Sequence, residues 1–249
     1  HMAASNESTL QRTFSVVEYL SREKRKVPLQ ELAGALCLTS AAAHRLLNGL
    51  MELGYVDQDE NKRYYLTYKV YKVAGKSLNR DNFLQDMIPY MNYFAMRYGC
   101  EVGLTVFADD TIIHVLNVGR NINLGKDCLR PGQVFPLYCS APGKAFLAQM
   151  APDALSRWIE ESALLPHTIR TIIDKQQLYQ EIRRTRDQGY GVSEGELYDI
   201  VYAVAFPIHD QSGAAIGTFN FRMLPETYQE NMCSTFTEDV QRALENFGL

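Results

Sequence analysis

One short stretch of the sequence, SAAAHRLLN, combines small residues with side chains that can read the edges of DNA bases. Its candidate DNA-contacting residues are Ser40, Ala41, Ala42, His44, Arg45 and Asn48. Arginine and asparagine can each form two hydrogen bonds with guanine and adenine, respectively, and a methyl group can lie against the thymine methyl. Small residues at the start of such a helix leave room for it to enter a groove. Alanine-rich turns are also simply good helix formers, so the stretch has to be judged in its context.

The elements around this stretch favour DNA contact. Apolar spacing predicts helices over 9–22 and 29–36, and Thr39 or Ser40 can cap a third helix that ends before Gly54. The inner face of the third helix is expected to carry Ala43, Leu46, Leu47, Leu50 and Leu53. After Gly54 the period changes to two, and YVDQ and RYYLTY flank the polar turn DENK, which predicts a β-hairpin. Three helices followed by a hairpin is the order of a winged helix-turn-helix.

Basic residues accompany this predicted domain. Lys62 and Arg63 at the hairpin tip, together with the run 24–26, can hold phosphates without reading sequence. Residues 1–80 carry 12 Lys and Arg against 8 Asp and Glu, whereas residues 81–249 carry 13 against 21. A basic N-terminal part followed by an acidic remainder is typical of a phosphate-binding domain attached to a separate domain. An acidic part as large as residues 81–249 argues against a protein that merely coats DNA.

The bulk composition indicates a globular protein of one large or two modest domains. The chain has 249 residues, of which 46% are hydrophobic and 22% charged, with a net charge of −4. No apolar stretch approaches the roughly 20 residues that a membrane-spanning helix needs. The polar start AASNESTLQRT does not resemble a signal peptide. We therefore expect a cytoplasmic protein without a membrane partner.

Cysteine and histidine usage predicts neither disulfides nor a metal site. The five cysteines are Cys37, Cys100, Cys128, Cys139 and Cys233, and no two of them form a C-x-x-C pair. Scattered thiols suit a reducing compartment. The histidines lack the spacing that gathers metal ligands, and no cofactor-binding motif is present.

The rest of the chain predicts a linker helix and an α+β domain. The expected division is a DNA-binding domain over 1–66, a basic amphipathic linker helix over 67–82, and a third region over 83–249. In that region helices are expected over 83–99, 142–150, 151–161, 174–189 and 225–247, and strands over 100–108, 111–119, 200–210 and 214–223. Helices on an antiparallel sheet suggest a small-molecule-binding domain of the GAF or PAS kind, although many α+β folds share this outline.

Longer motifs resemble a known family. The segment PLQELAGALCLTSAAAHRLLNGLMELGYVDQDENKRYYLT resembles the DNA-binding domain of IclR-type bacterial transcriptional regulators. The signatures of that family's effector domain are matched, in order, by FPLYCSAPGKAFLAQM, TIRTIID, IRRTRDQGYGVSEGE and AVAFPIHDQSGAAIGTFNF. The resemblance implies an α/β (α+β) protein, with an N-terminal winged helix-turn-helix and a C-terminal GAF-like effector-binding domain. It also implies homodimers or dimers of dimers that bind palindromic operators in double-stranded DNA and respond to small organic acids or aromatic compounds.

The recognition stretch departs from the family pattern. Family members commonly carry a basic residue, then Ser and Thr, ahead of the His-Arg pair, where this chain has Ser40, Ala41 and Ala42. The alanines permit groove entry but contribute little polar readout. Sequence specificity is therefore expected to rest on His44, Arg45 and Asn48.

The resemblance also indicates where the effector binds. The candidate effector-binding residues are Ser140, Ala141, Gly143, Ser193, Glu194, Ala203, Asn220 and Arg222. Backbone N–H groups at the helix start in SAPGKAF can hold a carboxylate. Pro142 removes one such donor, or is a plain structural choice for a first helical turn.

The strand TFNFRM stands where many relatives have SISGP. Alternation sends Thr218, Asn220 and Arg222 to one face and Phe219 and Phe221 to the other. If the polar face lines the pocket, Arg222 can hold a carboxylate with two hydrogen bonds. Alternatively Arg222 lies in solvent or pairs with an acid such as Glu194. We expect a small carboxylate effector, with aromatic acids among the candidates, although most of the 15 Tyr and 11 Phe belong to the core.

The alternative is a small cytoplasmic hydrolase or transferase that uses Cys139 or Ser140. In YCSAPGK the serine and lysine are four apart, which is not the S-x-x-K spacing of serine acylases, and no G-x-S-x-G elbow is present. A thiol ahead of a helix can be reactive, but a buried inert cysteine is the commoner case. The sequence thus predicts a regulator and no enzyme.

Overall fold

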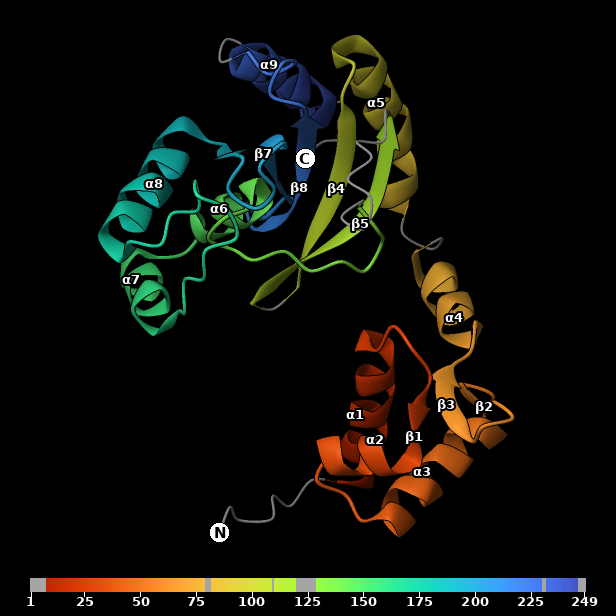
Figure 1. Ribbon diagram of the computed structural model, residues 1–249. Helices are drawn as coiled ribbons and strands as arrows, with labels where there is room; N and C mark the ends of the chain where they lie inside the picture. Colours follow the sequence, from red (N-terminus) through yellow and green to blue (C-terminus); the bar gives the residue numbers. More distant parts are fainter. Residues whose placement is uncertain (1–7, 79–81, 109, 120–128, 230–231, 246–249) are drawn as a thin grey trace. The chain divides into compact units, whose positions relative to one another are not determined.

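The computed structural model describes residues 8–78, 82–108, 110–119, 129–229 and 232–245 (Figure 1). The chain divides into two compact units, His1–Gln85 and Asp86–Leu249. Within the described residues, no helix is both long enough and apolar enough to cross a lipid bilayer.

The N-terminal unit is a winged helix-turn-helix. Its helices are α1 (Thr9–Arg22), α2 (Leu29–Ala35) and α3 (Ser40–Glu52). Its antiparallel sheet has the order β1-β3-β2, formed by β1 (Val27–Pro28), β2 (Val56–Gln58) and β3 (Arg63–Leu66). The predicted helices and hairpin are confirmed. Strand β1 was not predicted, because two residues are too few to show a period.

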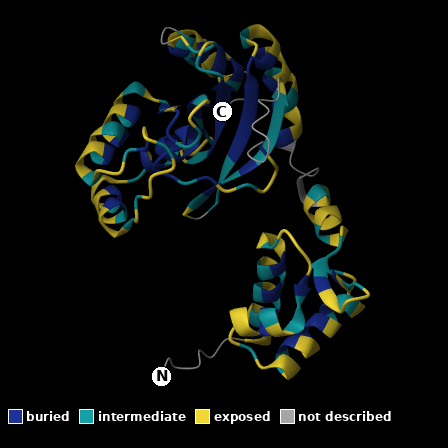
Figure 2. Cartoon of the chain, viewed as in Figure 1, coloured by how far each residue is buried: buried dark blue, intermediate teal, exposed yellow. Residues whose placement is uncertain are grey.

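The leucines of α3 build the core of this unit, with one exception. The buried cluster joins Val16 and Leu20 of α1 and Leu32 of α2 to the inner face of α3 (Figure 2). Leu53 was expected on that face but is 61% exposed. The helix ends at Glu52, and Leu53 is its C-cap, directly before the left-handed Gly54 (φ 74°), so Leu53 lies beyond the last buried residue of this face, Leu50.

Two helices follow the wing. Helix α4 (Lys69–Leu78) falls within the predicted linker helix, of which residues 79–81 lie outside the described part of the chain. Helix α5 (Asn82–Tyr98) matches the helix predicted over 83–99.

The C-terminal unit is built on a five-stranded antiparallel sheet of order β5-β4-β8-β7-β6. Its strands are β4 (Glu101–Ala108), β5 (Thr111–Gly119), β6 (Gly191–Glu194), β7 (Tyr202–His209) and β8 (Ala215–Met223). Both predicted hairpins are confirmed, and they join through the pairing of β4 with β8. The predicted Asp109-Asp110 turn includes Asp109, which lies outside the described residues. The short edge strand β6 was not predicted.

Aromatic side chains cover one face of this sheet. Phe219 and Phe221 of β8 contact Phe94 of α5 and Phe236 of α9 (Met232–Glu245), respectively. Figure 1 shows α5 and α9 beside the sheet. The Phe221 and Phe236 rings stack with centroids 4.5 Å apart. The helix predicted over 225–247 begins later than expected, because the carbonyl of Leu224 accepts the N–H groups of Thr227 and Tyr228 in a tight turn.

Small residues cover the other face. Helix α6 (Ala141–Leu147) packs Ala141 and Ala145 against Ala203 and Ala205 of β7. Helices α7 (Pro152–Glu161) and α8 (Lys175–Gln188) pack with α6 through a separate apolar cluster. Beside the start of α6, polar side chains of β5 and β8, namely His114, Asn220 and Arg222, line a cavity.

Candidate DNA-contact helix and effector cavity

Helix α3 presents its polar residues to solvent. Ser40, Ala41, His44, Arg45 and Asn48 are exposed, and Ala42 is half-buried. Thr39 caps the helix by accepting the N–H of Ala42 on its hydroxyl at 3.2 Å, while the leucines of the opposite face anchor the helix in the core. The polar face of α3 is therefore exposed to solvent, while the opposite face anchors the helix in the core.

Two neighbours on this face interact with each other. Asn48 Nδ2 lies 3.3 Å from His44 Nδ1, one helical turn away. Arg45 enters no ion pair with another described residue. Its guanidinium keeps its donors for an external acceptor such as a guanine edge or a phosphate.

The wing tip is a tight, cationic turn. The carboxylate of Asp59 accepts the N–H of Arg63 at 2.9 Å and that of Asn61 at 3.0 Å, and these backbone donors lower the pKa of Asp59. Lys62 adopts a left-handed conformation (φ 56°), and both Lys62 and Arg63 are exposed. Two residues of the basic run 24–26 already form ion pairs, Arg25 with Glu31 and Lys26 with Asp59.

A small cavity, with a volume of ≈ 40 Å³, lies on the α6 side of the C-terminal sheet. Six of the eight residues predicted for the effector site line it: Ser140, Ala141, Ser193, Ala203, Asn220 and Arg222. They come from α6, β6, β7 and β8, which are far apart in the sequence. The other lining residues include His114, Phe135 and Tyr198.

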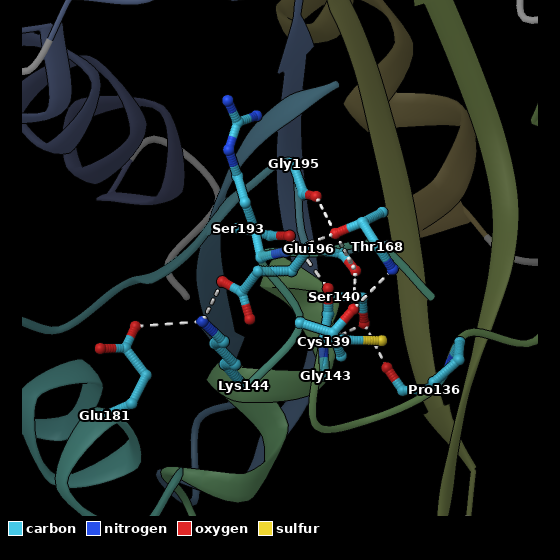
Figure 3. A network of polar contacts seen from close by, with 12 residues as sticks. Pro136, Cys139, Ser140, Gly143, Lys144, Thr168, Glu181, Ser193, Gly195 and Glu196 are labelled. Atoms are coloured by element: carbon cyan, nitrogen blue, oxygen red, sulfur yellow. Dashed lines mark hydrogen bonds and ion pairs between the residues drawn. The ribbon is translucent and has the colours of Figure 1, made fainter. Parts of the chain in front are cut away.

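Gly143 and Glu194 lie outside this cavity. The Gly143 N–H donates to Ser140 Oγ at 3.2 Å, and Ser140 Oγ in turn donates to the carbonyl of Pro136 at 2.7 Å (Figure 3). A Cβ on Gly143 would lie 2.4 Å from Leu137 Cα, so glycine is needed there for close packing. Glu194 is exposed and lines a separate hollow with Arg170. The helix start therefore offers fewer free N–H donors than the sequence suggested.

A buried lysine fastens α6 to its surroundings. Lys144 is 1% exposed, and its Nζ lies 2.5 Å from Glu196 Oε1 and 3.1 Å from Glu181 Oε1 (Figure 3). Burial raises the pKa of Glu196, an effect that the Lys144 charge opposes. Ser193 Oγ donates to the carbonyl of Cys139 at 2.9 Å and ties β6 to the loop before α6. These contacts hold the cavity wall in one arrangement.

Arg222 lines the cavity and is paired with an acid that sequence analysis had not named. Arg222 Nη1 lies 2.6 Å from Glu101 Oε2, and both side chains are buried. Asn117 Nδ2 donates to the other oxygen of Glu101 at 2.8 Å. Of the expected alternatives, solvent exposure is wrong, whereas pairing with an acid is confirmed, with Glu101 in place of the suggested Glu194. Burial raises the pKa of Glu101, and the neighbouring guanidinium opposes that shift.

The other polar residues of β8 are also bonded. Thr218 Oγ1 donates to Asn220 Oδ1 at 2.7 Å and lies 2.5 Å from Thr105 Oγ1 on β4. The predicted alternation of Thr218, Asn220 and Arg222 on one face with the phenylalanines on the other is confirmed. Because Asn220 Oδ1 accepts from Thr218, the amide nitrogen of Asn220 is turned the other way.

Comparison with known proteins identifies both units. The chain matches the model of the IclR helix-turn-helix domain over residues 9–60 and that of the bacterial transcriptional regulator IclR C-terminal domain over residues 75–247. The chain belongs to the IclR family. As a family of DNA-binding transcriptional regulators, it is not a family of enzymes.

Named relatives of this IclR-family chain are regulators of similar length. The HTH-type transcriptional regulator KdgR of Escherichia coli (strain K12) is 26% identical over 210 residues, covering 84% of this chain and 79% of that protein. The Pca regulon regulatory protein of Pseudomonas putida is 25% identical over 213 residues, covering 86% and 73%. An IclR homolog from Microbacterium hydrocarbonoxydans, solved in complex with 4-hydroxybenzoate, has the same fold at 17% identity, with a TM-score of 0.79 and coverage of 96% and 100%.

Cys139 and Ser140, the nucleophiles of the alternative hydrolase or transferase hypothesis, are not activated in this IclR-family structure. Cys139 is fully buried, and burial raises the pKa of its thiol to about 12, so the thiolate is scarce near neutral pH. Ser140 Oγ donates to the carbonyl of Pro136, which is no base. Both residues belong to the segment that leads into α6.

Sequence reasoning overlooked two polar residues of the cavity region, Glu101 and His114. His114 lies in β5, is fully buried and has its Nε2 3.3 Å from Asn117 Oδ1. Burial lowers the pKa of His114 to about 4. The signal that could have revealed it is a single histidine among apolar residues in TIIHVLNVG. A polar residue in an apolar strand is itself a reason to expect a partner or a ligand.

Proposed function

We propose that this IclR-family regulator binds a palindromic operator as a homodimer or a dimer of dimers and that a small organic acid controls its operator affinity. The observation that carries the proposal is the gathering of six sequence-predicted residues, including the buried Arg222, around one cavity. The protein is expected to act in the cytoplasm, where bacterial DNA is found.

In the proposed DNA complex, α3 lies in the major groove. Arg45 and Asn48 have the chemistry to read guanine and adenine edges, and His44 lies beside them on the exposed face. Ser40, Ala41 and Ala42 at the helix start leave space for close approach. Lys62 and Arg63 on the wing contact phosphates and set the orientation without reading sequence.

In the proposed effector complex, a carboxylate lies at Arg222. A guanidinium has five N–H donors, so it can hold a ligand carboxylate beside that of Glu101. Phe135 and Tyr198 in the cavity wall favour an aromatic acid among the candidates. The structure of the Microbacterium homolog with 4-hydroxybenzoate supports the same class. Gly143 and Glu194 are not assigned ligand contacts, because they lie outside the cavity.

Coupling is proposed to run through the linker helix over 67–82, between a DNA-binding domain over 1–66 and an effector domain over 83–249. Effector binding would change the spacing of the two recognition helices in a dimer. Half-sites must fall about 34 Å apart, one helical turn of DNA, so a modest shift alters operator affinity.

The test begins with the operator. Selection from a random duplex library with the full chain is expected to enrich a palindrome, which is then used in fluorescence anisotropy with and without organic acids. Calorimetry of wild type beside Arg222→Ala tests the anchor, with circular dichroism checking that the variant folds. Equal affinity in the two proteins would remove Arg222 from the site, and failure to enrich any DNA sequence would overturn sequence-specific recognition.

A further inference from the structure

The cavity contains one buried acceptor whose protonation can be derived from its neighbours. His114 is fully buried and lines the cavity, and its Nδ1 has no hydrogen-bond partner among the described residues. A buried polar atom without a partner is costly, and such atoms concentrate where a ligand supplies the missing bond.

A chain of hydrogen bonds determines which nitrogen of His114 carries the proton. The carboxylate of Glu101, ion-paired with Arg222, can only accept, so Asn117 must present Nδ2 to it, at 2.8 Å. Asn117 Oδ1 then faces His114 Nε2 at 3.3 Å and accepts from it. Burial lowers the pKa of the imidazole to about 4 and keeps the ring neutral; the hydrogen bond with Asn117 opposes this shift, and the nearby Arg222 charge adds to it. A neutral ring with its proton on Nε2 has a bare lone pair on Nδ1.

The space beside Gly103 borders both this nitrogen and an amide donor. The ideal Cβ position of Gly103 is 3.6 Å from His114 Nδ1 and 3.7 Å from Asn220 Nδ2. Gly103 pairs directly with Asn220 across β4 and β8, so its missing side chain would point to the same face as Asn220. The absence of a side chain at Gly103 leaves an acceptor and an amide donor facing the same small space.

We propose that the effector carries a hydroxyl group, which donates to His114 Nδ1 and accepts from Asn220 Nδ2 while its carboxylate lies at Arg222. This inference rests on the proposed function and narrows the ligand class to hydroxy acids. A hydroxyl is both donor and acceptor, whereas an ether or a ketone only accepts and would leave Nδ1 unsatisfied. Glycine at 103 makes the hydroxyl subsite possible, because a methyl group there would lie 3.2 Å from His114 Cε1.

The first test needs no ligand. Long-range ¹H–¹⁵N NMR of the full chain with ¹⁵N-labelled histidine reports the protonation of each ring nitrogen. The His114 signal is assigned with His114→Gln and, should that variant misfold, by elimination with variants of the other histidines. We expect a neutral ring with a proton on Nε2 at pH 7. A proton on Nδ1 would overturn the inference, since no acceptor would then face the cavity.

The second test compares matched ligands. Calorimetry with 4-hydroxybenzoate, 4-methoxybenzoate and benzoate, and with lactate and propionate, is expected to show a hydroxy acid binding about 10–100-fold tighter than its matched analogue. His114→Phe removes the acceptor and should abolish that preference, and Gly103→Ala should weaken the hydroxy acid most. His209→Phe, on β7, is the control and should keep the preference.

The outcomes separate the two proposals. Acids that bind equally well with and without a hydroxyl would reject the hydroxyl subsite and leave the carboxylate effector standing. A preference that survives in His114→Phe would reject His114 as its cause. If no member of the panel binds wild type, the carboxylate class and the hydroxyl subsite are both rejected, while operator selection still reports on DNA binding.

Discussion

The same two residue types occur in opposite settings in the two units of this protein. His44 and Arg45 of α3 are exposed, and no described acid pairs with Arg45. His114 and Arg222 of the C-terminal sheet are buried, and Arg222 is bound to Glu101 at 2.6 Å. The first pair is open to a large polar partner, with His44 bonded only to its neighbour Asn48, whereas the second pair borders a small cavity.

The exposed and the buried residues achieve selectivity in different ways. An exposed arginine reorients at little cost and discriminates only when a base edge satisfies it. Buried polar groups have fixed directions, so a ligand that fails to match them leaves an unsatisfied atom in a low-dielectric environment. We therefore expect substitutions in the cavity to affect folding strongly and those on α3 to affect DNA binding alone.

The largest effect is expected when the buried pair is broken. Glu101→Ala leaves the guanidinium of Arg222 buried without its carboxylate, which should lower the free energy of unfolding by about 3–5 kcal/mol. The matched variant is Glu18→Ala, which breaks the exposed Arg22–Glu18 pair of α1 and should have a much smaller effect. Urea denaturation of both variants measures the contrast. Equal losses would contradict the comparison between the two units.

Acid should destabilise the protein through His114. Its folded pKa of about 4 lies below the ordinary value of 6.5, so the unfolded chain binds the proton more tightly. Stability from the neutral ring is complete above pH 6.5 and is lost as the pH falls toward 4, by ~3 kcal/mol for a shift of this size.

Unfolding free energies of wild type and His114→Gln between pH 7 and pH 4 test this expectation. The variant should lose less stability over that range than wild type. His44→Gln is the matched control, because that side chain is exposed, and it should follow the wild-type profile. Parallel curves for wild type and His114→Gln would show that the buried ring does not resist protonation.

Removing the arginine of α3 should affect DNA binding and leave folding intact. Arg45→Ala should weaken binding to the selected operator by about 10–100-fold, the range for losing one base-reading contact. Arg183→Ala, an exposed arginine on α8, is the control. Anisotropy titrations on operator and scrambled duplexes measure the effect, and an equal loss on both would assign Arg45 to phosphate contact instead.

The smallest effect concerns the support of α3. Thr39→Ala removes the hydroxyl that accepts the Ala42 N–H and should lower the unfolding free energy by about 1 kcal/mol. Thr39→Ser keeps the cap and should restore most of that loss. Circular dichroism during urea unfolding measures the stability of both variants. Identical unfolding midpoints for wild type and the two variants would show that the Thr39 cap does not contribute to stability.

Local pattern was sufficient for the DNA-binding unit. Helix spacing, the Thr39 cap, Gly54 and the period-two hairpin are all encoded by neighbours in the chain, and the structure confirmed each of them. Errors came where the local signal ends: the two-residue β1, the exposed Leu53 at the C-cap, and the start of α9 after the Leu224 turn.

Sequence patterns were enough to predict the order of all described elements except the short strands β1 and β6, the polar face of β8, and the family whose motifs the chain carries. Three features become visible only in the fold: Glu101 pairs with Arg222, Gly143 and Glu194 lie outside the cavity, and His114 Nδ1 has no hydrogen-bond partner among the described residues. They could not be predicted because the residues involved are far apart along the chain. Glu101 and Arg222 are brought together by the pairing of β4 with β8, and no periodicity within either strand specifies which residue of the other will face it.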